Sequence, residues 1–275
     1  MHTLLKQALA AALFTCSSLS FATPVLSIAN EQYQQAYEKQ ALLAETGLRE
    51  IDVPNDVSYH KAMRYQAVPL QPLLKKAGIQ ASDSLKFTAS DGFAVTLSAS
   101  LLLAEGKAEP YLAIETDDAP WPPVKPGKPG TAGPLYVVWL SPEKSGITPE
   151  MWPYQLARIE RVQPVEIRYP QLQPAATLPA NSPIRNGFAQ FKQHCLPCHS
   201  LNKAGDANLA PDLNIPHNPT EYLRAPYLRT LVRNPQKLRH WERSAMPAVD
   251  EKTLSERDLT DLLAYLRHMS TRKVK

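Results

Sequence analysis

Cysteine is scarce in this chain of 275 residues. It occurs three times, at Cys16, Cys195 and Cys198, and residues 23–194 contain none. That long segment therefore offers no thiolate to a metal ion. Long apolar runs are scarce as well. After the N-terminal residues, no segment approaches the ~18 apolar residues that a membrane-spanning helix needs, so we expect a soluble product.

The one long apolar run lies in the N-terminal stretch "MHTLLKQALAAALFTCSSLSFATP". A basic residue, an apolar run over residues 8–14, and small residues at Ser20 and Ala22 are typical of a secretory signal. We therefore predict that residues 1–22 are a signal peptide cleaved after Ala22. The mature protein would then lie in the periplasm.

Cys16 lies inside this predicted signal, where a cysteine can also carry a lipid anchor. Lipid anchoring is disfavoured here because Phe14 and Thr15 are bulkier or more polar than the small residues that usually precede a lipidated cysteine. Removal of the signal leaves Cys195 and Cys198 as the two cysteines of the mature chain. An oxidising compartment normally joins neighbouring thiols in a disulfide. A specific use of the two cysteines must therefore explain why they lie so close together in the sequence.

The composition changes twice along the mature chain. Residues 169–183, "YPQLQPAATLPANSP", contain four prolines and predict an extended linker between two domains, residues 23–168 and 184–275. Residues 23–183 carry 14 Lys/Arg and 17 Asp/Glu, a net charge of −3, whereas residues 184–275 carry 15 and 9, a net charge of +6. The basic excess suits a docking surface for an acidic partner, although solvated helix faces explain it equally well.

The first domain has the patterns of a mixed α+β fold. In "PLQPLLKKAGI", leucines at helical spacing and a stop at Gly78 predict a short helix. Alternating apolar residues on both sides of Asp91-Gly92 predict a hairpin. We expect a long loop at "APWPPVKPGKPGTAGP". Further strands are expected at residues 111–116, 134–140 and 157–169, the last interrupted by Pro164.

The second domain has helical patterns and is predicted to be all-α. Ser182 and Pro183 suit the N-cap and first position of a helix whose apolar face continues to Cys195. Near the C-terminus, Thr253 and Glu256 have capping-box spacing, and the leucines that follow recur at helical intervals. We expect these two helices to pack against each other.

A short motif lies at the end of the first of these helices, in "FKQHCLPCHS", residues 191–200. A zinc site needs four ligands, and besides this cysteine pair the domain offers only the scattered His194, His217, His240 and His268. A redox dithiol usually lies in an α/β fold, whereas a helical pattern precedes this one. A disulfide across two residues closes too small a ring to stabilise the fold much. The remaining chemistry is haem attachment, in which both thiols form thioethers and the following histidine ligates iron.

Further features accompany the motif: Gly187 and Phe191 before it, Pro211 after it, Met246-Pro247 farther on, and Tyr265 in a terminal helix. In this order of features the sequence resembles the class I c-type cytochromes, over essentially all of residues 184–275. The methionines other than Met246, which are Met63, Met151 and Met269, are expected to be core or surface residues, and His240 and Trp241 are expected to pack near the haem.

The resemblance implies one covalently bound haem c. Cys195 and Cys198 would attach it, and His199 and Met246 would be the axial ligands of the iron. The carbonyl of Pro211 would accept the other ring N–H of His199 and fix its tautomer. Because both axial positions would be filled, the iron would have no site for a substrate, which suits electron transfer. We therefore assign no catalytic residue.

The first domain resembles the molybdopterin-binding domain of sulfite oxidase-type enzymes, over about residues 50–162. The segments that carry the resemblance are "AVPLQPLLKKAG", "FTASDGFAVTLS", "WPPVKPGKPGTAGPLYVVW" and "ARIERV". In that family a cysteine thiolate ligates molybdenum, and this domain lacks the cysteine, so a molybdopterin centre is disfavoured. His60, Asp91, Trp121 and Tyr136 could line a site, but each is explained better by turn chemistry, packing or surface exposure.

We therefore expect a periplasmic monohaem cytochrome that passes electrons between a periplasmic oxidoreductase and a downstream acceptor. Its partner would be a redox protein and not a nucleic acid. Two alternatives remain. The chain could be a haem-containing oxidoreductase, either because its first domain binds a substrate or second cofactor or because Met246 is displaced and the haem binds substrate. Alternatively, the first domain could be an adaptor within a larger complex.

Overall fold

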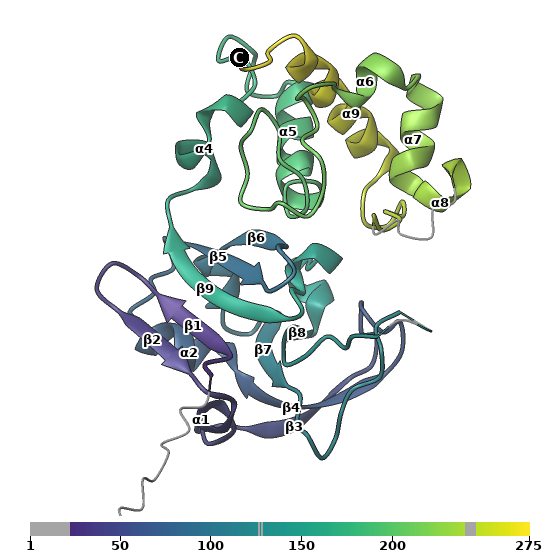
Figure 1. The fold of residues 1–275 in the computed structure, drawn as a ribbon. Coiled ribbons are helices and arrows are strands. Elements are labelled where there is room, and N and C mark those ends of the chain that lie inside the picture. Colours follow the sequence, from purple (N-terminus) through teal and green to yellow (C-terminus); the bar gives the residue numbers. More distant parts are fainter. Residues whose placement is uncertain (1–22, 126, 128, 240–245) are drawn as a thin grey trace, which may run out of the picture.

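The computed structural model describes residues 23–125, 127, 129–239 and 246–275. The predicted signal peptide, including Cys16, lies outside the described residues, and so do His240 and Trp241. The described residues form two hydrophobic cores, one within residues 26–159 and the other within residues 165–269. Figure 1 shows two sheets in the first part of the chain and helices in the second. No helix in the described ranges is long and apolar enough to cross a membrane.

The first sheet has five strands, in the spatial order β2 (Gln34–Tyr37), β1 (Leu26–Ala29), β9 (Leu156–Val162), β5 (Ser84–Ala89) and β6 (Ala94–Ser98). Strands β1 and β9 are parallel, and the other neighbours are antiparallel. The predicted hairpin is confirmed as β5 and β6, since Phe87 pairs with Val95. Its turn fits the sequence: the Asp91 carboxylate accepts a hydrogen bond from the Phe93 backbone N–H at 3.0 Å, and Gly92 has a φ of +96°.

The second sheet has four antiparallel strands, in the order β3 (Arg49–Val53), β4 (Met63–Pro69), β7 (Glu109–Ile114) and β8 (Leu135–Leu140). Strands β7 and β8 confirm two of the predicted strands. The predicted helix is also confirmed, as α2 (Leu70–Lys76), which precedes Gly78 at a φ of +71°. Short helices complete this α+β region: α1 (Lys39–Leu43), α3 (Ala99–Leu102), and the 3-10 turns η1 (Pro142–Ser145) and η2 (Pro149–Met151).

The predicted strand over residues 157–169 is correct only in its first part. Strand β9 ends at Val162, and Val165–Arg168 form the short helix α4. Pro164 causes the change, because it has no N–H for a sheet and its φ of −49° suits the position before a helix. Val165 then packs in the second core instead of the sheet.

The proline-rich segment after α4 packs against the helical part of the chain. Its 3-10 turn η3 (Pro170–Leu172) buries Leu172 completely, and the Leu172 carbonyl accepts a hydrogen bond from the Tyr265 hydroxyl at 2.7 Å. The domain boundaries that we place around residues 169–183 stay a prediction.

The described residues of the second region form five α-helices: α5 (Pro183–His194), α6 (Pro219–Tyr222), α7 (Ala225–Arg233), α8 (Pro235–Leu238) and α9 (Glu256–Ser270). The predicted start of α5 is confirmed, because the Ser182 hydroxyl accepts a hydrogen bond from the Ile184 N–H at 3.3 Å.

The predicted capping box of α9 is wrong. The N-cap is Ser255, whose hydroxyl accepts a hydrogen bond from the Asp258 N–H at 3.1 Å. Thr253 belongs to the preceding turn, where its N–H donates to the Asp250 carboxylate at 2.8 Å. That turn carries the chain past Thr253 before helical geometry begins, so the cap lies two residues later.

Helices α5 and α9 pack together as predicted, and they meet most closely at Gly187. A Cβ atom at this position would overlap the backbone carbonyl of Asp261 and would lie 2.7 Å from the Cβ of Tyr265. The Tyr265 ring lies beside two aromatic rings of α5, with centroid distances of 5.4 Å to Phe188 and 5.3 Å to Phe191. Only glycine allows this approach, so Gly187 sets how closely α5 packs against α9.

We predict that Gly187→Ala destabilises the helical region by about 3 kcal/mol. The added methyl group would overlap the backbone carbonyl of Asp261, which cannot move aside as a flexible side chain can. Thermal unfolding measures the effect. Ala189→Gly is the control, since Ala189 is exposed on the same helix and should cost only the intrinsic helix propensity, about 1 kcal/mol. An equal loss in both variants would contradict the close approach of the two helices.

Candidate functional site

The CxxCH segment forms a tight turn directly after α5. Cys195 is the C-cap of that helix, and its N–H donates to the Phe191 carbonyl at 2.9 Å. The Cys195 carbonyl then accepts hydrogen bonds from the Cys198 N–H at 3.1 Å and the His199 N–H at 2.8 Å. The end of α5 therefore holds both cysteines and the histidine within one turn.

Both cysteines are free thiols in a partly buried position. Burial raises the pKa of Cys195 to about 12, with a further contribution from the Glu150 carboxylate. Burial likewise raises the pKa of Cys198 to about 11. A redox dithiol requires the opposite, a lowered pKa that supplies a thiolate near neutral pH. The environment of the pair therefore disfavours the redox-dithiol alternative.

One ring nitrogen of the motif histidine makes a hydrogen bond within the protein. His199 Nδ1 donates a hydrogen bond to the Pro211 carbonyl at 2.7 Å, so the structure brings together the two residues that the sequence analysis paired. Burial lowers the pKa of His199 and favours the neutral ring. A neutral imidazole with a proton on Nδ1 presents the lone pair of Nε2, which is the arrangement that metal-ligating histidines commonly use.

The carboxylate of Asp212 organises the loop that carries Pro211. Four backbone N–H groups donate to it, those of Asn202, Lys203, Asn214 and Ile215, at 2.6–3.2 Å. The Ser200 hydroxyl donates to it as well, at 3.2 Å. These bonds fold residues 200–215 back toward the motif, which places the Pro211 carbonyl beside His199.

Three buried asparagines connect the same loop to the C-terminal part of α9. Asn214 Nδ2 donates to the side-chain oxygen of Asn202 at 2.7 Å and to the Met269 carbonyl at 2.8 Å. Asn218 Nδ2 donates to the side-chain oxygen of Asn214 at 2.9 Å and to the Leu266 carbonyl at 3.0 Å. The sequence analysis missed this ladder, because asparagines at irregular intervals give no periodic signal.

Met246, the predicted distal ligand, lies in the segment between α8 and α9 and is partly buried. The segment is tied to α7 by the Val249 N–H, which donates to the Val232 carbonyl at 3.1 Å, and by Arg233, which donates to the Val249 carbonyl at 3.1 Å. Met269, in contrast, is buried in the helical core. Met63 and Met151 pack against the core of the sheets.

In a comparison with known families, residues 184–270 match the family model described as Cytochrome c. We call this region the cytochrome c domain, after the family that it matches. Its family supports haem c as the cofactor and electron transfer as the chemistry, and the spacing of Cys195, Cys198 and His199 is that of a CxxCH motif. No curated protein matches the chain.

The polar and aromatic candidates of the N-terminal domain do not form one site. His60 is exposed, and Asp91 lies in the β5–β6 turn. Trp121 and Tyr136 are buried beside Tyr65, with ring centroids 4.9 Å apart for Trp121–Tyr65 and 6.0 Å apart for Tyr136–Tyr65. They belong to the core of the domain.

Asp56 is the residue that organises this aromatic cluster, and the sequence analysis missed it. Its carboxylate is 2% exposed and accepts hydrogen bonds from the hydroxyls of Tyr65 at 2.7 Å and Tyr136 at 3.3 Å. The backbone N–H groups of Ser58 and Tyr59 donate to it as well. Every one of these contacts is internal, so Asp56 has the role of a structural anchor.

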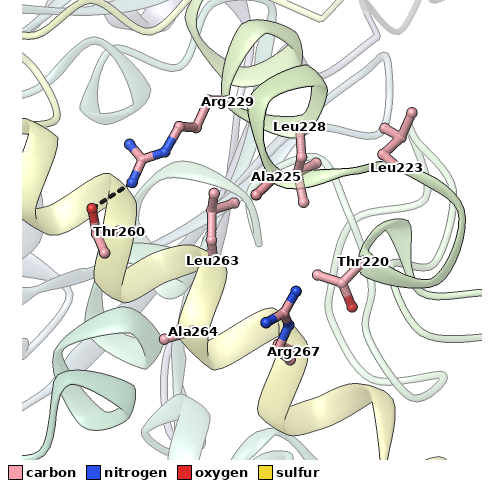
Figure 2. A pocket seen from close by; sticks show the side chains of 9 residues that line it. All are labelled: Thr220, Leu223, Ala225, Leu228, Arg229, Thr260, Leu263, Ala264 and Arg267. Atoms are coloured by element: carbon pink, nitrogen blue, oxygen red, sulfur yellow. Dashed lines mark hydrogen bonds between the residues drawn. The ribbon is translucent and has the colours of Figure 1, made fainter.

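A separate pocket of about 250 Å³ lies on the cytochrome c domain where α6 and α7 meet α9. Figure 2 shows its apolar floor, which includes Leu228 and Leu263, and its two arginines. Arg229 donates to the Thr260 hydroxyl at 2.6 Å and to Glu256 at 2.9 Å, which joins α7 to α9. The pocket contains no residue of the CxxCH motif and is distinct from the candidate haem site.

We predict that Asn214→Ala destabilises the cytochrome c domain by about 3 kcal/mol, because it leaves several buried polar partners without hydrogen bonds. Chemical denaturation monitored by helical circular dichroism measures the loss. Asn181 is exposed, so Asn181→Ala should stay within about 0.5 kcal/mol of wild type. If Asn214→Ala were as stable as that control, the ladder would not hold the loop on α9.

Proposed function

We propose that this protein is a periplasmic cytochrome with one covalently bound haem c, which transfers electrons between a periplasmic oxidoreductase and a downstream acceptor. The observation that carries the proposal is the hydrogen bond from His199 Nδ1 to the Pro211 carbonyl at 2.7 Å, directly beside two free cysteine thiols. Together with the match to the cytochrome c family, this arrangement supports haem ligation by the free ring nitrogen.

The residues present fit this cofactor. Cys195 and Cys198 are unpaired and would form the two thioethers. His199 has Nδ1 bound to a carbonyl, which leaves Nε2 as the nitrogen for iron. Met246 would supply the second axial ligand, and Pro247 restricts its backbone to extended geometry.

When bound, a haem with histidine and methionine ligands accepts and donates single electrons at a potential raised by the thioether. The protein contributes the rest. Pro211 fixes the tautomer and orientation of His199, and the Asp212 loop keeps Pro211 in place. Two protein ligands would leave the iron no open position, which favours electron transfer over substrate chemistry.

The cellular setting is part of the proposal. The signal-like residues 1–22 support export to the periplasm, where covalent attachment of haem would give the two cysteines a use other than a disulfide. We propose a redox protein as the partner. We also propose that the N-terminal domain works without a molybdopterin centre, since it has no cysteine to ligate molybdenum.

Replacement of the proposed distal ligand tests the axial assignment. We expect Met246→Leu to abolish the methionine-to-iron charge-transfer band and to let carbon monoxide bind the ferrous haem, because leucine has similar size and no sulfur donor. Met269→Leu is the matched control, since Met269 lies in the core of the same domain, and its spectrum should equal that of wild type. Loss of the band in Met269→Leu and not in Met246→Leu would contradict the assignment.

A further inference from the structure

The N-terminal domain contacts the cytochrome c domain at the haem-attachment motif itself. The Ala94 N–H in β6 donates to the carbonyl of Pro197 at 3.1 Å, and Pro197 lies between the two cysteines. In the adjacent turn, a Cβ at Gly92 would overlap the side-chain oxygen of Asn208. The β5–β6 hairpin therefore lies directly on the motif and on the loop that follows it.

A second contact joins the two domains next to Cys195. His194 Nδ1 donates to the Glu150 carboxylate at 2.9 Å, and the two side chains are only 2% and 15% exposed. Although burial opposes ionisation, the hydrogen bond from His194 holds the pKa of Glu150 below its usual value. His194 directly precedes Cys195 in the chain, so this hydrogen bond places the Glu150 carboxylate of the N-terminal domain beside the first attachment site.

A third contact is centred on Asp206, in the loop after the motif. Its side chain is 9% exposed and accepts hydrogen bonds from Arg168 at 2.6 Å and from the Tyr169 hydroxyl at 2.9 Å. Lys86 of β5 lies 3.4 Å from the same carboxylate. Arg168 also donates to the Thr96 hydroxyl of β6 at 3.1 Å. The guanidinium group therefore joins the haem-binding loop to the first sheet.

These three contacts have a common location. Each places N-terminal residues against the segment from His194 to Asn208, which contains both cysteines. Between the contacts a crevice of about 370 Å³ remains, lined in part by Thr96, Glu166 and Lys192. The hydrogen bonds that close the junction are partly buried, and polar contacts are common in interfaces between domains of one chain.

We propose that the N-terminal domain forms a fixed cover over the edge of the haem that is attached to Cys195 and Cys198. We propose also that it sets the haem potential by placing the Glu150 carboxylate beside that edge. This inference rests on the proposed function. A negative charge beside a haem stabilises the ferric state, and its effect is larger in a partly buried junction than in water. A redox partner must then approach the cytochrome c domain on a surface that the N-terminal domain leaves free.

Two variants of the haem-loaded full chain test the cover. In Arg168→Ala, which removes the link between Asp206 and Thr96, we expect amide hydrogen exchange in residues 92–98 to accelerate at least tenfold. The control is Arg64→Ala, because Arg64 pairs with Asp52 at 2.7 Å, the residues being 63% and 69% exposed, within the N-terminal domain. Exchange in residues 92–98 should be unchanged in that control.

The second variant, Glu150→Gln, removes one negative charge and keeps the side-chain shape. We expect the ferrous-to-ferric ratio at a fixed electrode potential to rise about threefold, which is a shift of ~28 mV at ~59 mV per tenfold change. Asp52→Asn removes one exposed carboxylate charge of the same domain and should leave the midpoint potential unchanged.

The proposal stands only if both results are found. Unchanged exchange in Arg168→Ala, or an unchanged or lowered midpoint potential in Glu150→Gln, overturns it. Failure of the proposed function looks different: a chain without covalent haem, or one whose spectrum lacks histidine–methionine ligation, would already show this in the wild type before any variant is compared.

Discussion

The close approach of α5 and α9 at Gly187 is the constraint on which the candidate haem site depends. Because α5 cannot shift along or away from α9 without losing the contacts of Tyr265 with Phe188 and Phe191, the C-terminal end of α5 has a fixed position. The CxxCH turn begins at that end. The same helix pair also binds the preceding proline-rich segment, through the hydrogen bond between Tyr265 and Leu172.

From this fixed turn, the site is completed by polar contacts between segments far apart in the sequence. The Asp212 carboxylate accepts hydrogen bonds from backbone N–H groups of its loop. The ladder of Asn202, Asn214 and Asn218 connects that loop to α9. Together they hold the Pro211 carbonyl at the His199 ring. The side of the motif that faces the N-terminal domain is held in addition by Glu150, Ala94 and Arg168. Residues 194–199, which contain the CxxCH motif, are thus held both by the loop that follows them and by the N-terminal part of the chain.

Local patterns in the sequence predicted the elements whose signals are local. The Asp91-Gly92 hairpin, the helix before Gly78 and the Ser182 cap each depend on neighbouring residues, and the structure contains all three. The start of α9 was placed at the wrong cap, because Thr253 and Ser255 both offer hydroxyls and only the preceding turn selects between them. Composition alone also did not show that Leu172, in a proline-rich segment, is completely buried.

At the site, the spacing within one short motif predicted that Cys195, Cys198 and His199 belong to a haem-attachment motif. The roles of these residues, and that of Met246 as an iron ligand, remain proposals. The contacts that support them were not predictable, since Asn214, Asp206 and Glu150 act on residues that are distant in the chain and follow no periodicity.

The most direct test of the central claim, that the protein carries one covalently bound haem c, is the intact mass of the denatured mature protein, followed by mapping of the modified peptide. We expect the mass of one haem to remain attached to the peptide that contains Cys195 and Cys198. An unmodified mature chain from cells that assemble c-type cytochromes would contradict it.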